Sequence, residues 1–307
     1  MKRFFVIGNG FDRHHGMPTG FNNFRDYVYA YDRCTYEFIT KIIKNSNPHF
    51  DSNDWNEIET ELTNVNNEDY DDILDKAIAN AETDMDRASY WNDIQLNSSI
   101  SSEKYERLKN ALDEWIQSII IEDFLPDKRI VFSENDYFIS FNYTETLEIL
   151  YDVPKNQIFH IHGDNCTEKI LGHNEYMEPP LKLSNITQEL YDHGIEDDWR
   201  VEEAKQIINN IPLIFYKDSK SIIEENYDLF QSIRGYDEVV FMGWSLGPQD
   251  DIYLYEIMRN INPNTRLTVV YYSREDLENF ESHFVDYCIS ENLVSYVSWE
   301  DIDTIFY

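Results

Sequence analysis

The chain has 307 residues and a formal net charge of -34, from 59 Asp and Glu against 25 Lys and Arg. Hydrophobic residues make up 42% and aromatic residues 15%, a balance that excludes a disordered chain and permits a buried core. So negative a protein repels the phosphate backbone, and no basic patch interrupts the charge, so we expect no nucleic-acid partner. The acidic surface is interpreted as a solvating one, with imitation of nucleic acid as the alternative.

The cysteines and the hydrophobic runs restrict the compartment. Cys34, Cys166 and Cys288 show no C-x-x-C spacing, which excludes a disulfide framework and a cysteine zinc site. The first apolar run is too short for a signal peptide, and no run of about eighteen apolar residues follows. We therefore expect a cytoplasmic protein without membrane association.

Short apolar runs rich in β-forming residues recur along the chain, separated by long helical patterns and without tight hairpin signals. Strands of this kind predict a parallel sheet covered on both faces. The expected strands are residues 4–7, 137–141, 158–161, 239–242, 267–272 and 294–297. After the fifth, Ser273 is expected to cap a helix. The fold class is thus α/β, a doubly wound and mostly parallel sheet.

Two long helical stretches interrupt this alternation of strands and helices. The sequence predicts one domain over residues 1–307, with helical insertions at about 51–125 and 179–232. The first insertion carries an apolar stripe at helical spacing, which indicates a core-facing helix. The stripe consists of Tyr105, Leu108, Leu112, Trp115, Ile116 and Ile119.

The first strand runs into a turn with two glycines, Gly8 and Gly10, around Asn9. Such a turn lets backbone N–H groups approach a phosphate, and the helix that follows adds partial positive charge. Arg13 stands where the third glycine of the dinucleotide fingerprint falls, so an ordinary tight turn is the alternative. The phosphate hypothesis predicts that Gly10→Val weakens nucleotide binding without unfolding the protein.

Polar residues follow the second strand. Asn142 stands where a parallel sheet presents side chains to a ligand, beyond the carboxyl end of a strand. The alternative is an Asn that caps the helix starting near Glu145. Both interpretations stay open on the residues alone.

The third strand ends in two histidines. Strand alternation places His160 and His162 on one face of the sheet. The pair could bind a metal ion, but no Glu at a recognised spacing completes a ligand set, so no metal is expected. We favour His162, next to Gly163, as a general base and His160 as a structural residue.

The fourth strand leads into Gly243, Ser245 and then Asp250. A second phosphate or ribose contact is expected at this turn. The string G-W-S-L-G also fits the hydrolase elbow G-x-S-x-G, with Ser245 as nucleophile and His283 downstream. An elbow needs a helix directly after its serine, whereas Pro248 and a glycine follow here, so the esterase interpretation is the weaker one.

Taken together, the four clusters resemble the bacteriophage abortive infection AbiH family in order and spacing, over residues 1 to about 255. The motifs that carry the resemblance are Gly8-Asn9-Gly10-Phe11-Asp12, Phe141-Asn142-Tyr143-Thr144, His160-Ile161-His162-Gly163 and Gly243-Trp244-Ser245-Leu246-Gly247, ending at Asp250. The same landmarks are similar to sirtuins, which implies a sirtuin-like, Rossmann-type pocket for NAD or a related nucleotide.

The resemblance also implies residue roles. Gly8, Gly10 and Asp12 would lie near the diphosphate and Ser245 near the adenosine, while Asn142 would face the nicotinamide ribose and His162 would act as base. Asn9 and Asp250 complete the expected cofactor-binding set.

Three departures from the sirtuin pattern shape the expected activity. Asp12 replaces the sirtuin Ser, Thr144 replaces an Asp, and the four-cysteine zinc module is missing. The resemblance then implies an NAD glycohydrolase in antiphage defence rather than a deacetylase. The alternative is a non-catalytic nucleotide-binding sensor or toxin component acting through a protein partner. A phage-derived trigger and an oligomeric state are both compatible with the sequence.

Overall fold

The computed structural model describes residues 1–46, 55, 58–61, 67–83, 86, 88–90, 102–124, 130–164, 167, 169–173, 198–214, 216–287 and 289–302. The chain divides into two compact units. The first takes in Met1–Phe24, Asp113–Ile170 and Asp218–Tyr307, and the second takes in Arg25–Leu112 and Leu171–Lys217.

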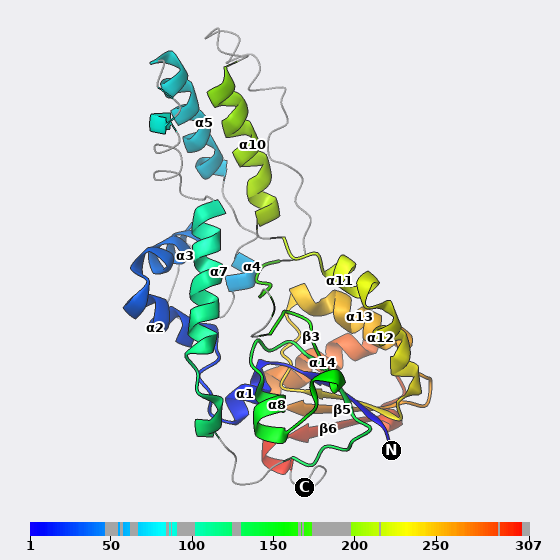
Figure 1. Ribbon diagram of the computed structural model, residues 1–307. Helices are drawn as coiled ribbons and strands as arrows, with labels where there is room; N and C mark the ends of the chain where they lie inside the picture. Colours follow the sequence, from blue (N-terminus) through cyan, green and yellow to red (C-terminus); the bar gives the residue numbers. More distant parts are fainter. Residues whose placement is uncertain are drawn as a thin grey trace. The chain divides into compact units, whose positions relative to one another are not determined.

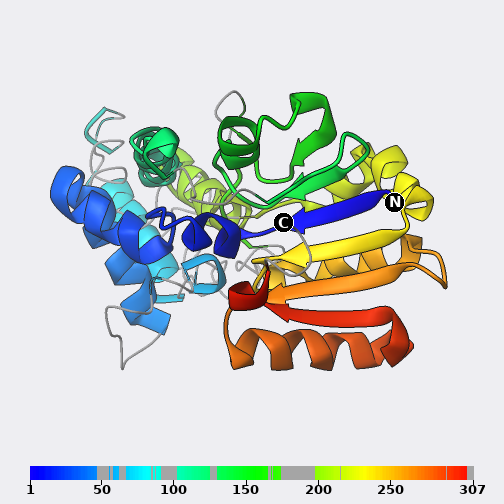
Figure 2. The same ribbon diagram turned by 90° about the horizontal axis from the view of Figure 1, so that it is seen from below.

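The first unit is built on a sheet of six parallel strands in the order β3-β2-β1-β4-β5-β6 (Figure 2). The strands are β1 (Arg3–Ile7), β2 (Tyr137–Ser140), β3 (Ile158–His160), β4 (Glu238–Met242), β5 (Arg266–Tyr271) and β6 (Val294–Ser298). Each lies where the apolar runs predicted it, within a residue or two. The doubly wound α/β fold is confirmed, and the pairing of these strands is parallel throughout.

Helices cover both faces of this sheet. One face, called here the α13 face, packs against α12 (Tyr227–Ser232), α13 (Asp251–Asn260) and α14 (Arg274–Asp286). The other, the α8 face, packs against α1 (Asn9–His14), α8 (Thr146–Tyr151) and the 3-10 turn η7 (Trp299–Asp301). The unit also contains α11 (Ser219–Glu225) and the 3-10 turns η2 (Ile121–Phe124), η3 (Lys155–Gln157), η4 (Ile233–Gly235), η5 (Pro248–Asp250) and η6 (Glu291–Leu293).

Strand alternation explains the two cores. On β1, Phe4 and Val6 belong to the α13 face, whereas Phe5 and Ile7 belong to the α8 face, and all four are buried. A strand buried on both faces reads as a continuous apolar run, which is the pattern from which β1 was predicted. After β5, α14 begins with the expected cap, because Ser273 and Asp276 form a reciprocal capping box.

The strand order fixes where a ligand would bind. The chain builds outward from β1 through β2 to β3, then returns to place β4 on the other side of β1. In doubly wound sheets ligands bind outside the carboxyl ends of the strands at the point where the order reverses. Here that point lies between β1 and β4, the strands that carry the two glycine turns.

The second unit is helical. It contains α3 (Arg33–Ser46), α4 (Ile58–Glu61), α5 (Asn67–Glu82) and α10 (Trp199–Ile214), and α2 (Phe21–Tyr31) and α7 (Ser102–Gln117) hold residues of both units. Helices α5 and α10 pack side by side (Figure 1). None of the helices in the described parts of the chain combines the length and apolar character needed to cross a bilayer.

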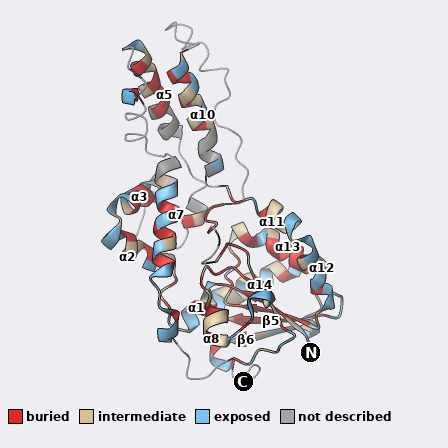
Figure 3. Cartoon of the chain, viewed as in Figure 1, coloured by how far each residue is buried: buried red, intermediate tan, exposed pale blue. Residues whose placement is uncertain are grey.

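Helix α7 carries the predicted apolar stripe. Leu108, Leu112, Trp115 and Ile116 are buried, and exposed residues occupy other positions around the helix (Figure 3). Ile119, just after the helix, is half-buried, and the side chain of Tyr105 lies outside the described residues. The interpretation of this stripe as core is therefore confirmed for the four buried positions.

Candidate functional site

The two glycine turns at the switch point pack backbone against backbone. Gly8 donates its N–H to the Met242 carbonyl at 3.0 Å, and Gly10 donates its N–H to the Gly243 carbonyl at 2.7 Å. A Cβ on Gly10 would lie 2.8 Å from the Gly243 Cα, and a Cβ on Gly243 would lie 2.3 Å from the Phe11 nitrogen. Gly243 also has φ +68, a conformation that favours glycine. Close approach of the two turns therefore requires glycine at these positions.

This packing corrects one sequence-based expectation. Gly10→Val was expected to leave the fold intact because the side chain would enter a space kept for a diphosphate. Instead, the space beside Gly10 is occupied by the backbone of Gly243, and the Gly10 N–H is already donated within the protein. Asn9 is likewise held within the fold, since its amide nitrogen donates to the Thr19 carbonyl and its amide oxygen accepts from the Thr19 hydroxyl.

Asp12, the last residue of the first motif, is completely buried. The hydroxyl of Thr144 donates to one of its carboxylate oxygens at 2.5 Å, and that of Thr146 donates to the other at 2.8 Å. Burial raises the pKa of Asp12 to about 6, although the bonds from Thr144, Thr146 and Asn142 act in the opposite direction. Asp12, on α1, is thus hydrogen-bonded to the loop between β2 and α8 and to the first residue of α8.

Asn142 follows β2 and is 5% exposed. Its side-chain amide acts on Asp12 as a donor that lowers the pKa of that carboxyl, and its carbonyl accepts from the His160 ring at 3.2 Å. Its own amide oxygen is buried and has no hydrogen-bond partner among the described residues. Helix α8 begins at Thr146 with no side-chain cap, so the alternative of Asn142 as its cap is excluded. A buried acceptor held at a strand end and not yet bonded is suited to a ligand donor.

The two histidines lie on opposite faces of the sheet. His160 bonds to Glu148 on α8 at 3.0 Å, whereas His162 packs on Tyr253 of α13, with ring centroids 6.4 Å apart. The expectation of a shared face is wrong because β3 ends at His160 and the chain turns at His162. Alternation holds only inside a strand.

His162 occupies an aromatic surrounding. It is 4% exposed, and its ring centroid lies 5.4 Å from that of Phe141 and 6.0 Å from that of Tyr143. His160 is held differently, by the Asn142 carbonyl and the Glu148 carboxylate. Burial opposes its charged form, but the bond to Glu148 and that residue's charge outweigh burial and raise the pKa of His160.

In the loop after β4, Asp250 has an internal partner. Its carboxylate accepts from the Trp244 indole at 3.1 Å, and Trp244 stacks on Phe141 with centroids 4.6 Å apart. Ser245, the neighbouring predicted contact, is exposed, and its carbonyl accepts from Asn279 at 2.8 Å. Of the residues predicted for this loop, Ser245 is the one whose side chain faces solvent.

The geometry of this loop does not form a hydrolase elbow. The positive φ values fall at Gly243 and Leu246 rather than at Ser245. A 3-10 turn, η5, separates the serine from α13, which begins only at Asp251. His283 pairs with Asp251 at 3.3 Å. The structure therefore gives the esterase interpretation no support.

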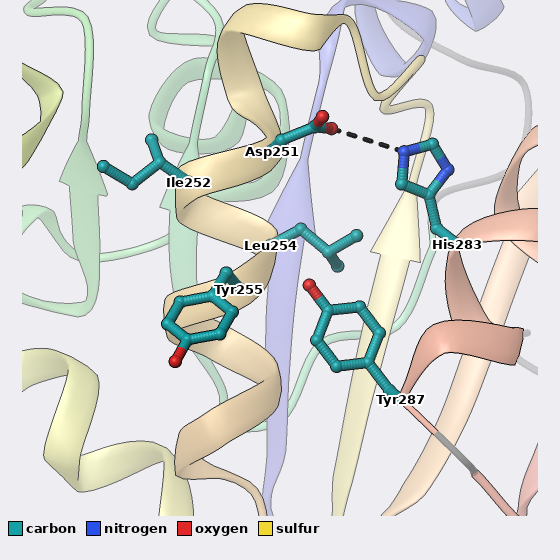
Figure 4. Close-up of a pocket in the computed structure, with 6 residues that line it drawn as sticks. All are labelled: Asp251, Ile252, Leu254, Tyr255, His283 and Tyr287. Carbon is teal, nitrogen blue, oxygen red and sulfur yellow. Dashed lines mark ion pairs between the residues drawn. The ribbon is translucent and has the colours of Figure 1, made fainter.

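A hollow of about 370 Å³ lies between α13 and α14 (Figure 4). Its lining residues are Asp251, Ile252, Leu254, Tyr255, His283 and Tyr287. None of them is a residue predicted for the nucleotide site. No group of three or more His, Cys, Asp and Glu side chains within the described ranges could hold a metal ion.

Sequence reasoning missed Thr146 and Glu148, which hold Asp12 and His160 in place. Both are on α8, and no local pattern marks them. A buried carboxylate needs donors, and two hydroxyls spaced two residues apart could have been proposed as such donors. Their pairing with Asp12 is visible only in the folded chain.

The strand order, the paired glycine turns and the polar residues at the strand ends define a doubly wound α/β protein of Rossmann type. The chain belongs to the bacteriophage abortive infection AbiH family, whose model matches residues 4–272. The match spans β1 to β5 and includes every predicted site residue. Searches of curated proteins and of solved structures found no match.

Proposed function

We propose that this AbiH protein acts in antiphage defence as an NAD glycohydrolase. NAD would bind outside the carboxyl ends of β1, β2, β3 and β4, and water would cleave it to nicotinamide and ADP-ribose. Loss of the cellular NAD pool would then end phage growth together with that of the infected cell. The cytoplasm, where both the NAD pool and the replicating phage are found, is the compartment that this role requires.

The observation that carries this proposal is the state of Asn142. Its amide oxygen is buried without a partner among the described residues, next to the switch point of a Rossmann-type sheet. Leaving a buried acceptor unbonded costs about 1–3 kcal/mol, so a protein that keeps one gains when a ligand supplies the donor. A ribose hydroxyl is such a donor. A pocket for the nicotinamide ribose beside Asn142 accounts for this side chain.

The reaction assigns the chemical step to two residues. The bond between ribose C1′ and the nicotinamide nitrogen breaks, and nicotinamide leaves with the electron pair. Water adds to the oxocarbenium-like carbon and loses a proton, which His162 accepts and returns to solvent. The Asn142 amide dipole stabilises the charge that develops on the ribose. Aromatic rings of Phe141, Tyr143 and Tyr253 around His162 limit the access of other water.

The other residues expected to contact NAD differ in how exposed they are. Ser245 offers an exposed hydroxyl for the adenosine side. Gly8, Gly10 and Gly243 shape the floor of the pocket through their mutual packing. Asp250 acts through Trp244, which it holds by a hydrogen bond.

A mass spectrum of the purified protein under native conditions tests the ligand, and nicotinamide release from added NAD tests the reaction. We expect bound NAD or ADP-ribose, and release that falls at least about a hundredfold in Asn142→Ala. Asn156, an exposed residue of η3, provides a matched control in Asn156→Ala.

A phage-derived trigger is controlled for by repeating the assay in extracts of infected cells. Bound nucleotide without release in such extracts would overturn the hydrolase and favour the sensor acting through a protein partner. Neither bound nucleotide nor release would overturn the NAD pocket itself.

A further inference from the structure

We propose that Asp12 is a positioning residue: its carboxylate determines which end of the Asn142 side-chain amide faces the ligand, without touching the ligand itself. The identity of that ligand rests on the proposed function, whereas the orientation of the amide does not.

The carboxylate of Asp12 is enclosed by donors. It is completely buried, and the hydroxyls of Thr144 and Thr146 each donate to one of its oxygens. The side-chain amide of Asn142 acts on the same carboxylate as a third donor and lowers its pKa. These partners all come from the segment that follows β2, so Asp12 binds that segment and has no exposed surface for a phosphate or a sugar.

An ionised carboxylate can only accept hydrogen bonds. The amide of Asn142 has a donor end and an acceptor end, so its NH2 must face Asp12 and its oxygen must face the other way. The oxygen that is thereby turned away from Asp12 is the one that is buried without a partner among the described residues. The charge on Asp12 therefore presents an acceptor, rather than a donor, to the pocket.

Two hydrogen bonds hold the backbone of Asn142 in place, whereas its side-chain amide can still rotate. Its N–H donates to the Ser140 hydroxyl at 3.2 Å, and its carbonyl accepts from His160 at 3.2 Å. An Asn in place of Asp12 could either donate or accept, so it would allow both orientations of the Asn142 amide. In the reversed orientation the Asn142 NH2 would meet the ribose hydroxyl, which would then have to accept the hydrogen bond instead of donating it.

The positioning role makes stability and affinity change in opposite directions. Asp12→Asn removes a buried charge and keeps the shape of the side chain, so the melting temperature should be equal to or above that of the wild type. The affinity for NAD, measured by calorimetry, should fall about tenfold, the usual value of one oriented hydrogen bond. Asp228→Asn, at an exposed position on α12, is the matched control and should change neither quantity.

The orientation of the Asn142 amide can also be measured without a ligand. The observable is the side-chain NH2 signal of Asn142 in the NMR spectrum of the full-length protein, and the signal is assigned by its loss in Asn142→Ser. Protonated Asp12 no longer fixes the amide, so this signal should shift with pH in the wild type and stay constant in Asp12→Asn. His160, which pairs with Glu148, is an ionisable group on a neighbouring element that acts on Asp12, so its own titration is a second source of a pH-dependent signal. If Asp12 is the source of the shift, the shift should persist in His160→Gln.

The outcomes separate this proposal from the proposed function. An amide signal that ignores pH in the wild type, or that titrates equally in Asp12→Asn, overturns the positioning role. Equal NAD affinity in the wild type and Asp12→Asn overturns it as well, and leaves the NAD pocket standing. If the Asn142 signal titrates with Asp12 in a protein that binds no NAD, the positioning role is supported and NAD is removed as the ligand.

Discussion

Gly10 and Gly243 are joined by a backbone hydrogen bond of 2.7 Å, so the turns after the two central strands β1 and β4 form one packed unit. The Cβ that any other residue would add at Gly10 meets the Cα and the carbonyl oxygen of Gly243, both at 2.8 Å. Backbone atoms cannot move aside as the end of a flexible side chain can. This contact makes the glycine pair a determinant of stability, whichever ligand binds nearby.

Gly10→Val is therefore expected to lower the free energy of unfolding by about 1–3 kcal/mol, the usual cost of overpacking. Urea denaturation monitored by circular dichroism measures the change. Gly235→Ala is the control, because a Cβ at Gly235 meets nothing within 4 Å and its stability should match the wild type. A Gly10→Val protein as stable as the control would show that the turns can separate without cost.

The raised pKa of Asp12, about 6, predicts a pH-dependent stability. A folded-state pKa above the usual value of 3.8 means that the stabilising contribution of Asp12 is complete below about pH 3.8 and is lost as the pH rises through about 6. Compared with Asp12→Asn, the wild type should gain about 1–2 kcal/mol of unfolding free energy between about pH 7.5 and about pH 5.

Denaturation curves of the wild type and Asp12→Asn at both pH values give this difference, and the many other carboxylates cancel in the comparison. A difference between the two proteins that does not change with pH would mean that Asp12 keeps an ordinary pKa.

His162 should matter for both stability and chemistry, which modifies the sequence-based view that it matters mainly for chemistry. Because the ring is 4% exposed and surrounded by aromatic side chains, His162→Ala should leave a cavity that costs about 2 kcal/mol. His162→Phe keeps a ring in this place and should recover much of that stability.

Both His162 variants should lose about two to four orders of magnitude in NAD turnover if His162 is the general base, with little change in NAD affinity. His283→Ala, on α14, is the control and should turn over NAD at the wild-type rate. Protection against phage should disappear with turnover. A folded His162→Phe protein that retains NAD turnover would end the base assignment.

Chelation of metal ions should leave the melting temperature and any NAD turnover unchanged. His160 and His162 face opposite sides of the sheet, and both ring nitrogens of His160 are already within hydrogen-bond distance of Asn142 and Glu148. The pair is therefore not arranged to bind one ion. Elemental analysis of the purified protein is the measurement, and a stoichiometric metal that disappears together with activity on chelation would revive a metallohydrolase.

The sequence by itself determined the strands and the fold class, and it predicted the edge of the sheet at which a site is expected. Strands buried on both faces must be almost entirely apolar, so β1 and β4 could be read directly from their composition. All strands of a parallel sheet end at one edge, so Asn142 and His162, which follow two different strands, could be assigned to one region. The cap at Ser273 was predictable because it depends on residues within one helical turn.

Only the tertiary structure decided the partners of these residues. The missing side chain of Gly10 suggested a space for a ligand, but the backbone of Gly243 fills that space. Asp12 was expected to contact a ligand, but the hydroxyls of Thr144 and Thr146 bond to its carboxylate instead. These partners lie more than a hundred residues away in the chain. The faces of His160 and His162 depended on where β3 ends, and edge-strand pairing sets that end. Local patterns record which residues are buried, whereas contacts across the sheet are created only when distant segments meet.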